Sequence, residues 1–318
     1  MTTGDGYFDL QVNGYGGIDF NQDGLSAAQL HTACEKLAAD GVAGILATIT
    51  TETMDRMCGR LKRLVELRAA DGLAKRLIWG LHVEGPFLNP APGYRGAHPL
   101  DAIGPPNEDA AKRLLDAGGG LVRLLTLAPE QDAQLRVTGM LVRAGVVVSA
   151  GHCDPSLEQL QAACDAGLSM FTHLGNGCPM QMHRHDNIIQ RALSLRDRLW
   201  LCFIADGAHV AMPALGNYLR AASLPRAIVV TDAISAAGLG PGRYTLGRWN
   251  LQIGPDMVAR APDGSHLVGA AITMRQSQRN LQERLGLSET DSRRLLVENP
   301  RRALGIGPDP AEALQGPS

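Results

Sequence analysis

Two histidines, His152 and His173, each follow a short apolar run in the sequence. The segment between them, 154–166, has the periodicity of an amphipathic helix. The pattern predicts a strand–helix–strand unit with one imidazole at the carboxyl end of each strand. The ends of neighbouring parallel strands lie at the same edge of a sheet, so two imidazoles placed there form a suitable pair of metal ligands.

Glu84 follows a third apolar run, 77–83, and supplies a carboxylate at a corresponding position. Two imidazoles and one carboxylate with an open coordination position are typical of a catalytic zinc or similar divalent ion. Such an ion lowers the pKa of a water and polarises a carbonyl, and hydrolysis also requires a base. Asp232 ends the run 227–231 before a loop of small residues and is the best candidate for that base. These residues predict a metal-dependent hydrolase.

Further polar residues occur at equivalent strand ends: Gln11, Asn13, Asp206 and His209. A single histidine is more often a core or capping residue, and a single aspartate at a strand–helix junction is usually an N-cap. The coincidence of several such residues at one end of one sheet favours a functional site instead.

Eight apolar or alternating runs predict strands, and amphipathic segments between most of them predict helices. The strands are 7–13, 44–50, 77–83, 121–128, 145–150, 168–172, 200–205 and 227–231. The helices are 26–39, 53–70, 107–117, 130–144, 156–166, 187–196 and 213–222. This alternation indicates βαβ units and a parallel sheet. Eight repeats without a G-x-G-x-x-G or Walker loop predict an α/β protein with a (β/α)8 TIM barrel, not a doubly wound sheet.

The texture of the sequence changes after Asp232. Segment 241–268 is rich in Gly and Pro and contains short alternating runs at 243–246, 249–253 and 257–259, which predict β-hairpins outside the barrel. Two further helices are predicted at 273–285 and 291–304. The expected organisation is a catalytic barrel over 7–240 plus 270–305, a small β subdomain over 241–269 and a tail over 306–318.

Composition excludes several classes of protein. The chain has 318 residues, of which 45% are hydrophobic and 19% charged, as in folded globular domains. Its net charge of -2 offers no basic field for nucleic acid or an anionic membrane. The first six residues carry no apolar signal segment, and no apolar run is long enough to span a bilayer, so a cytoplasmic location is expected.

The six cysteines form no C-x-x-C pair, and we expect them to be buried free thiols. Cys153 and Cys178 lie next to candidate site residues. A thiolate at either position is therefore an alternative zinc ligand.

Seven segments together carry a resemblance to a known family. The chain resembles N-acetylglucosamine-6-phosphate deacetylases of the amidohydrolase superfamily. Each segment alone is weak, but their order and combination are specific; they are residues 9–14, 80–87 with 96–98, 149–152, 172–176, 204–209, 230–233 and 269–274.

The resemblance implies roles for individual residues. Glu84, His152 and His173 match the family's metal ligands, and Asp232 matches its catalytic carboxylate. The positions that hold the sugar and its phosphate match His98, Asn176, Gly177 and His209. Arg184 matches an arginine that reaches across a dimer to the phosphate in the neighbouring subunit, so a homodimer is expected.

The first strand departs from the superfamily's common His-x-His, because it has Gln11 and Asn13. One divalent ion is therefore expected in place of two, with zinc first and iron, manganese and cobalt as alternatives. Family members usually have β-sandwich strands before the barrel and after its last helix. About six residues precede Tyr7 here, so the resemblance implies a truncated sandwich limited to 241–268. Gly177, Cys178 and Cys153 also replace the family's usual residues close to the metal.

The expected reaction is removal of the acetyl group from N-acetylglucosamine 6-phosphate to give glucosamine 6-phosphate and acetate. Asp232 would move the proton, and His98 together with the metal would stabilise the oxyanion. One alternative is a related amidohydrolase for a different N-acyl or cyclic amide substrate. The other is a non-catalytic sugar-phosphate-binding barrel, against which the presence of Asp232 beside three ligands argues.

Overall fold

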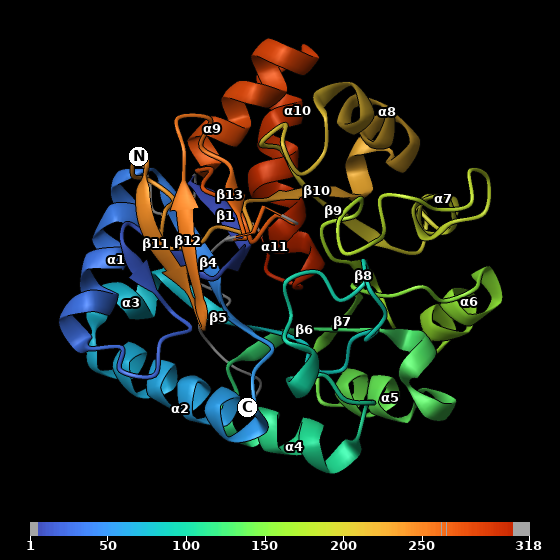
Figure 1. The fold of residues 1–318 in the computed structure, drawn as a ribbon, viewed down its shortest axis with the longest axis horizontal. Helices are drawn as coiled ribbons and strands as arrows, with labels where there is room; N and C mark the ends of the chain where they lie inside the picture. The colour runs from blue at the N-terminus through green and yellow to red at the C-terminus, as the bar shows by residue number, and fades with distance from the viewer. Residues whose placement is uncertain (1–5, 262, 265, 308–318) are drawn as a thin grey trace.

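Eight parallel strands form the centre of the molecule (Figure 1). The structure is a computed structural model that describes residues 6–261, 263–264 and 266–307. The strands pair in the order β1 (Tyr7–Val12), β4 (Val42–Thr50), β5 (Ile78–Glu84), β6 (Val122–Leu127), β7 (Val147–Ala150), β8 (Met170–Phe171), β9 (Trp200–Ile204) and β10 (Ala227–Val230). All eight predicted strands are confirmed, with bounds that differ from the predicted ones by at most two residues.

The sheet closes into a barrel at the seam between β10 and β1. Val12 forms a parallel bridge with Ala233, and the Asn13 N–H donates to the Ala233 carbonyl at 2.7 Å. The buried Asp9 carboxylate also joins the two strands, because it accepts hydrogen bonds from the Thr231 N–H at 3.2 Å and the Thr231 hydroxyl at 2.5 Å. The predicted (β/α)8 barrel is therefore confirmed.

A ring of helices surrounds the strands (Figure 1). Ser26 and Ser156 begin α1 and α6 with complete capping boxes, as their sequences favour. Helix α3 was not predicted; the Asp71 side chain caps it by accepting from the N–H groups of Leu73 and Ala74. The helices are α1 (Ala27–Ala39), α2 (Met54–Ala70), α3 (Gly72–Leu77), α4 (Glu108–Ala117), α5 (Arg136–Arg143), α6 (Leu157–Asp165), α7 (Ile188–Ser194) and α8 (Met212–Ala222).

The helix predicted over 130–144 is wrong in its first half. Two short 3₁₀ turns, η2 (Pro129–Gln131) and η3 (Ala133–Leu135), occupy that part, and α5 begins only at Arg136. The Asp132 carboxylate accepts hydrogen bonds from the N–H groups of Val137 and Thr138 at 3.2 and 2.7 Å. These local bonds hold a turn that competes with a continuous helix.

Two small antiparallel sheets lie outside the barrel. A short hairpin that was not predicted, β2 (Gly14–Tyr15) and β3 (Ile18–Asp19), follows β1. The other sheet contains β11 (Gly242–Leu246), β12 (Trp249–Ile253) and β13 (Ala259–Arg260). The first two predicted hairpin strands are confirmed. The third was placed two residues too early, because Met257 closes a turn onto the Gly254 carbonyl.

The last described segment returns along the barrel as helices, so the predictions of helix at 273–285 and 291–304 are confirmed. These elements are α9 (Met274–Arg279), the π-helix η5 (Asn280–Arg284), α10 (Glu289–Arg293), the π-helix η6 (Arg294–Glu298) and α11 (Asn299–Ala303). Two other 3₁₀ turns are η1 (Leu100–Ala102) and η4 (Leu224–Arg226). The predicted tail lies outside the described residues from 308 onward.

Within the described part of the chain, no helix combines the length and apolarity needed to cross a membrane.

Candidate metal centre and active site

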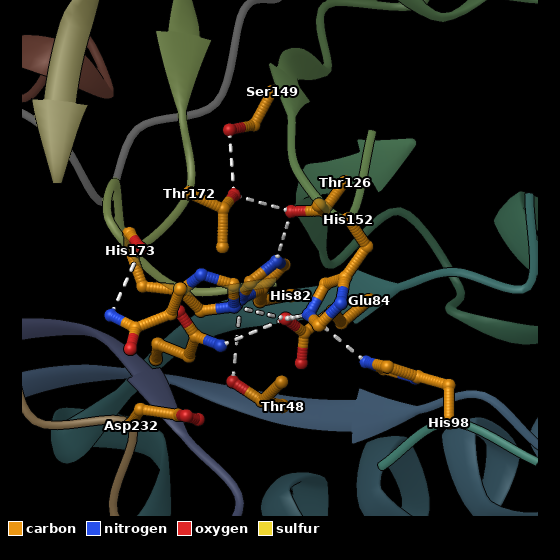
Figure 2. Close-up of polar contacts among 12 residues, drawn as sticks. Thr48, His82, Glu84, His98, Thr126, Ser149, His152, Thr172, His173 and Asp232 are labelled. Atoms are coloured by element: carbon orange, nitrogen blue, oxygen red, sulfur yellow. Dashed lines mark hydrogen bonds and ion pairs between the residues drawn. The ribbon is translucent and has the colours of Figure 1, made fainter. Parts of the chain in front are cut away.

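The Glu84 carboxylate stands at the centre of a cluster of site residues (Figure 2). Glu84 is the last residue of β5, while His152 and His173 follow β7 and β8. Its Oε1 atom lies 2.9 Å from Nε2 of His173 and 3.4 Å from Nε2 of His152. The Gln11 amide also donates to the same oxygen at 3.1 Å. The three predicted metal ligands are thus brought together at the carboxyl ends of their strands.

This donor set fits a divalent ion. Bonds of about 2.0–2.1 Å around a tetrahedral ion place ligand atoms roughly 3.3 Å apart, close to the two N–O distances at Glu84. His152 Nδ1 donates to the Tyr94 carbonyl at 2.8 Å, which leaves Nε2 as the ring nitrogen that faces the carboxylate. His173 Nδ1 is buried and has no hydrogen-bond partner among the described residues. The chemistry of these side chains and the two distances to Glu84 therefore suit a divalent metal, whereas the group whose ligand atoms all lie within 4.8 Å of one another contains His98 in place of His173.

His98 joins the cluster from the loop between β5 and η1. Its Nε2 lies 3.2 Å from Nε2 of His152, and the ligand atoms of Glu84, His98 and His152 all lie within 4.8 Å of one another. Its Nδ1 lies 2.8 Å from the Thr51 hydroxyl. Burial lowers the pKa of His98 to about 3, so its imidazole is neutral. His98 was predicted to be both a catalytic and a substrate-binding residue, and the structure places it directly beside the predicted metal ligands His152 and Glu84.

Burial and the neighbouring polar groups shift the pKa values of Glu84 and His173 in opposite directions. Burial alone would raise the pKa of Glu84, but its hydrogen bonds to His152 and His173 and the nearby imidazoles lower it well below the usual range. Burial alone would lower the pKa of His173, but the hydrogen bond between His173 and Glu84 outweighs burial and raises that pKa. Glu84 therefore remains an anion in a buried site.

Asp232 lies across the barrel mouth from His98 in the view of Figure 2. The Asn13 amide donates to its Oδ1 atom at 2.7 Å, the only hydrogen bond to its side chain among the described residues. Burial and then the Glu84 charge raise the pKa of Asp232 to about 6, against the opposing effects of His173, His209 and Asn13. A carboxylate that titrates near neutral pH is suited to take up and release a proton.

Gln11 and Asn13, which stand where the superfamily has imidazoles, each contact one of the two carboxylates. Gln11 donates to Glu84 and Asn13 donates to Asp232. These neutral amides therefore orient the two acids without adding a second set of metal ligands. The sequence indicated the missing ligands, but it did not reveal which carboxylate each amide contacts.

The backbone is unusual at three of the proposed site residues. His152, His173 and Asp232 have φ angles of 52°, 32° and 53°, in the left-handed region that residues other than glycine seldom adopt. Such conformations concentrate at functional sites, where the surrounding structure maintains them. The ring of His152 is also confined by glycine: a Cβ atom on Gly177 would lie 2.8 Å from its Nδ1.

The other predicted substrate-binding residues do not form one cluster of contacts. His209 Nδ1 lies 2.6 Å from Asp206 Oδ2, so Asp206 orients that ring. The Asn176 amide donates to the His173 carbonyl at 3.2 Å, within its own turn. Arg184 is exposed, and among the described residues it has no hydrogen bond or ion pair with the other predicted site residues.

The cysteine alternative receives no support from the structure. Burial raises the pKa of the Cys153 thiol well above its usual value and that of Cys178 to about 11, so both are protonated at neutral pH. Within the described residues, neither thiol belongs to a group of potential metal ligands.

A chain of buried polar groups beneath the site was missed by the sequence analysis. The His82 Nε2 lies 2.8 Å from the Thr126 hydroxyl, which contacts Thr172 at 2.7 Å, and Thr172 contacts Ser149 at 2.7 Å (Figure 2). Each of these is a single polar residue at or near the end of an apolar run, so only their convergence in the barrel identifies the network. Burial lowers the pKa of His82 to about 4, which keeps the ring neutral.

Curated relatives align with nearly the whole chain. The N-acetylglucosamine-6-phosphate deacetylase of Bacillus subtilis is 30% identical over 303 residues, which cover 95% of this chain and 75% of that protein. The N-acetylgalactosamine-6-phosphate deacetylase of Escherichia coli O157:H7 is also 30% identical, over 94% of this chain and 77% of that protein. No family model matches the chain.

Solved structures agree with these relatives. A variant N-acetyl-D-glucosamine-6-phosphate deacetylase from Mycobacterium smegmatis, in complex with N-acetyl-D-glucosamine-6-phosphate, superimposes with a TM-score of 0.85 at 31% identity and covers 95% of this chain and 77% of that one. The N-acetylglucosamine-6-phosphate deacetylase from Thermotoga maritima gives a TM-score of 0.83 at 28% identity, over 95% of this chain and 78% of that one. Taken with the barrel and its strand-end cluster, these similarities show that the chain belongs to the N-acetylglucosamine-6-phosphate deacetylase family, hydrolases that act on carbon–nitrogen bonds.

Proposed function

We propose that the protein hydrolyses the acetamide of N-acetylglucosamine 6-phosphate and releases acetate and glucosamine 6-phosphate. The observation that carries this proposal is the arrangement of the two carboxylates. Glu84 lies between the imidazoles of His152 and His173. Among the described residues, Asp232 makes no hydrogen bond or ion pair with either imidazole, and it titrates near neutral pH. Glu84 is therefore suited to bind a metal ion, and Asp232 is suited to transfer a proton.

Glu84, His152 and His173 would hold one divalent ion, and zinc is our first choice because it favours mixed nitrogen and oxygen ligands. When bound, such an ion polarises a carbonyl and makes water a stronger nucleophile. We assign these three residues the metal in preference to His98 because they lie at or directly after barrel strands. Rigid elements hold ligands more accurately than loops do.

Asp232 would take the proton from the attacking water and return it to the sugar nitrogen as the C–N bond breaks. Asn13 engages Oδ1, which leaves Oδ2 as the oxygen that carries this proton. The electrostatic effects of His173 and His209 limit the rise in the pKa of Asp232 to about 6, so the carboxylate is mostly ionised at neutral pH.

His98 would contact the acetyl carbonyl as charge develops on its oxygen. Since its imidazole is neutral, Nε2 can donate only when the Thr51 hydroxyl donates to Nδ1 and gives up its 3.1 Å hydrogen bond to the backbone carbonyl of Glu84. Asn176, Gly177 and His209 line the same end of the barrel, and we propose that they contact the sugar and its phosphate.

We further propose a homodimer in which Arg184 reaches the phosphate in the partner subunit. The supporting observation is that Arg184 is exposed in a loop that also exposes Met180 completely. Replacement of Arg184 by Met should raise KM for the phosphorylated sugar and leave KM for the unphosphorylated sugar unchanged. Sedimentation would test the dimer independently, and a monomer with unaltered kinetics would refute the role in trans.

In this proposal, the barrel at 7–240 plus 270–305 carries the catalysis and segment 241–269 is a supporting β subdomain. Sugar phosphates are charged metabolites retained within cells, so we place the reaction in the cytoplasm.

The relative that acts on N-acetylgalactosamine 6-phosphate supports a second candidate substrate. The two sugars differ in the configuration of one hydroxyl, which none of the residues assigned above is known to contact. The proposed reaction on the acetamide would be the same for both.

The decisive experiment is an acetate-release assay on both phosphorylated sugars and on unphosphorylated N-acetylglucosamine, with and without a chelator. We expect turnover of N-acetylglucosamine 6-phosphate that the chelator abolishes and added zinc restores. Faster turnover of the galactose epimer would reassign the substrate. Equal rates on the unphosphorylated sugar would favour another N-acyl compound, and binding without acetate release would favour a sugar-phosphate-binding protein.

A further inference from the structure

The turn between β11 and β12 contacts the His98 loop on both sides of the histidine. The Trp249 indole N–H donates to the Ala97 carbonyl at 3.0 Å, one residue before His98. Nη1 of Arg248 lies 3.0 and 3.2 Å from the two carboxylate oxygens of Asp101, three residues after it. Two consecutive residues, Arg248 in the turn and Trp249 at the start of β12, therefore hold both flanks of a proposed catalytic residue.

The same arginine also holds the segment that carries the partner of His98. Nε of Arg248 donates to Oε2 of Glu52 at 3.0 Å, and its Nη2 donates to Oε1. Only 3% of the Glu52 side chain is exposed. Burial would raise the pKa of Glu52, but Arg248 lowers it below the usual value. Glu52 directly follows Thr51, whose hydroxyl contacts His98 Nδ1.

The β11–β12 hairpin has other attachments to the rest of the chain, separate from these contacts. The Gly247 N–H donates to the buried Asp19 carboxylate at 2.6 Å. The Ser235 hydroxyl donates to the Thr245 carbonyl at 2.6 Å and accepts from the Thr245 N–H at 3.2 Å. The hairpin is thus anchored on β3 and on the loop after Asp232, which makes it a fixed support for the His98 loop.

We propose that Arg248 and Trp249 are positioning residues that set the location of His98 relative to the metal ligands. His98 needs such support because it comes from a loop, whereas Glu84, His152, His173 and Asp232 lie at or just after strand ends. The inference rests on the proposed role of His98 and adds a task for the small β-sheet: it maintains the oxyanion partner of an active site that the barrel strands otherwise build.

A double-mutant cycle between Arg248 and His98 tests the proposal. A misplacement of about 1 Å can reduce turnover about 100-fold, so we expect Arg248→Met to lower kcat by roughly 10- to 100-fold. KM and metal content should change little, because the metal ligands lie on strands. In a His98→Gln background, Arg248→Met should cause no further loss. Equal fold-losses in both backgrounds would overturn the proposal, because they would show that Arg248 acts independently of His98.

The matched control is Arg243→Met, which removes an exposed arginine from β11 of the same sheet and should leave kcat unchanged. Trp249→Phe is a milder variant that keeps an aromatic ring and removes the indole N–H. It should reduce kcat several-fold, again only when His98 is present. This variant keeps the test available if Arg248→Met fails to fold.

Hydrogen exchange of the backbone amides at residues 94–103 provides a readout that does not depend on activity. Arg248→Met should speed exchange in this segment at least several-fold relative to Arg243→Met, and unchanged exchange would overturn the inference. Wild-type turnover in His98→Gln would instead refute the proposed role of His98, even if the exchange result shows that the hairpin holds the loop. The two failures are therefore distinguishable.

Discussion

The two sides of the barrel mouth carry carboxylates in opposite environments. On the side formed by β5, β7 and β8, Glu84 faces two imidazoles, and its pKa is lowered well below the usual range. At the seam between β10 and β1, Asp232 and Asp9 face an amide and a hydroxyl, and burial raises their pKa values to about 6 and about 7. All three belong to the same barrel, in which Glu84 and Asp9 are buried and Asp232 is half-buried.

This difference shows that burial alone does not decide what a carboxylate can do. Where imidazoles offset the cost of desolvation, the group stays an anion and can bind a cation. Where only neutral groups donate, desolvation prevails and the group titrates near neutral pH, as a proton carrier requires. One barrel therefore provides one carboxylate suited to a metal ion and another suited to proton transfer, from the same kind of side chain.

The largest expected effect is the loss of metal affinity when Glu84, the carboxylate that faces the two imidazoles, is replaced. Glu84→Gln replaces the anion shared by His152 and His173, and we expect metal affinity to fall more than 100-fold, beyond the roughly 10–100-fold typical of an outer-shell partner. Turnover should be lost with the metal. Metal analysis after dialysis measures the effect. Glu130→Gln is the matched control, since Glu130 is a half-buried carboxylate beyond β6 that contacts Asn89 and Asp154 instead. Full metal content in Glu84→Gln would contradict the assignment.

Asp232→Asn should reduce turnover without reducing metal binding, and so distinguish the roles of the two carboxylates. The amide keeps an oxygen that can accept from Asn13 but cannot carry the proton, so kcat should fall by roughly 10²- to 10⁴-fold. Metal content should match that of the wild type, because Asp232 is not one of the proposed ligands. Acetate release and metal analysis on the same preparation provide the two readouts. Unchanged turnover would remove Asp232 from the mechanism.

Asp9→Asn should have the smallest effect on catalysis and a clear one on stability. The pKa of Asp9 is about 7 in the folded chain and ordinarily 3.8, so the folded state binds more protons between these values. The stability that protonation of Asp9 contributes is complete below about pH 4 and is lost as the pH rises to about 7. The amide in the variant does not titrate. The unfolding free energy of the variant relative to the wild type should therefore increase across this window, by on the order of a few kcal/mol.

Urea unfolding at several pH values between 4 and 8 measures this difference. Asp19, whose pKa burial raises to about 6, is present in both proteins, so its contribution cancels. A constant difference between Asp9→Asn and wild type at every pH would show that Asp9 does not titrate in this window.

Much of the fold follows from local patterns. Strand β9 was predictable because a parallel barrel strand is buried on both faces and is almost uniformly apolar. Helix α1 was predictable because Ser26 and Gln29 form a capping box before an amphipathic segment. The first half of the helix predicted over 130–144 failed because the Asp132 side chain bonds to the N–H groups of Val137 and Thr138, a local competition that apolar periodicity does not register.

The candidate site was predictable to the extent that its residues end strands. Glu84, His152, His173 and Asp232 could be found because parallel strands bring their carboxyl ends together. Thr51 and Arg248 could not, since a threonine at a strand end and an arginine in a turn are common. Their importance depends on contacts between segments far apart in sequence, such as that between Arg248 and Glu52.

The sequence by itself determined the barrel, the types of the candidate metal-binding side chains and the order in which the chain supplies them, because periodicity and strand-end position are local properties. Only the tertiary structure decided which carboxylate faces imidazoles and which faces an amide, how Asp9 closes the seam, and where the β11–β12 turn meets the His98 loop. These properties depend on distances and burial, and folding sets both by bringing together strands and loops that the sequence keeps apart.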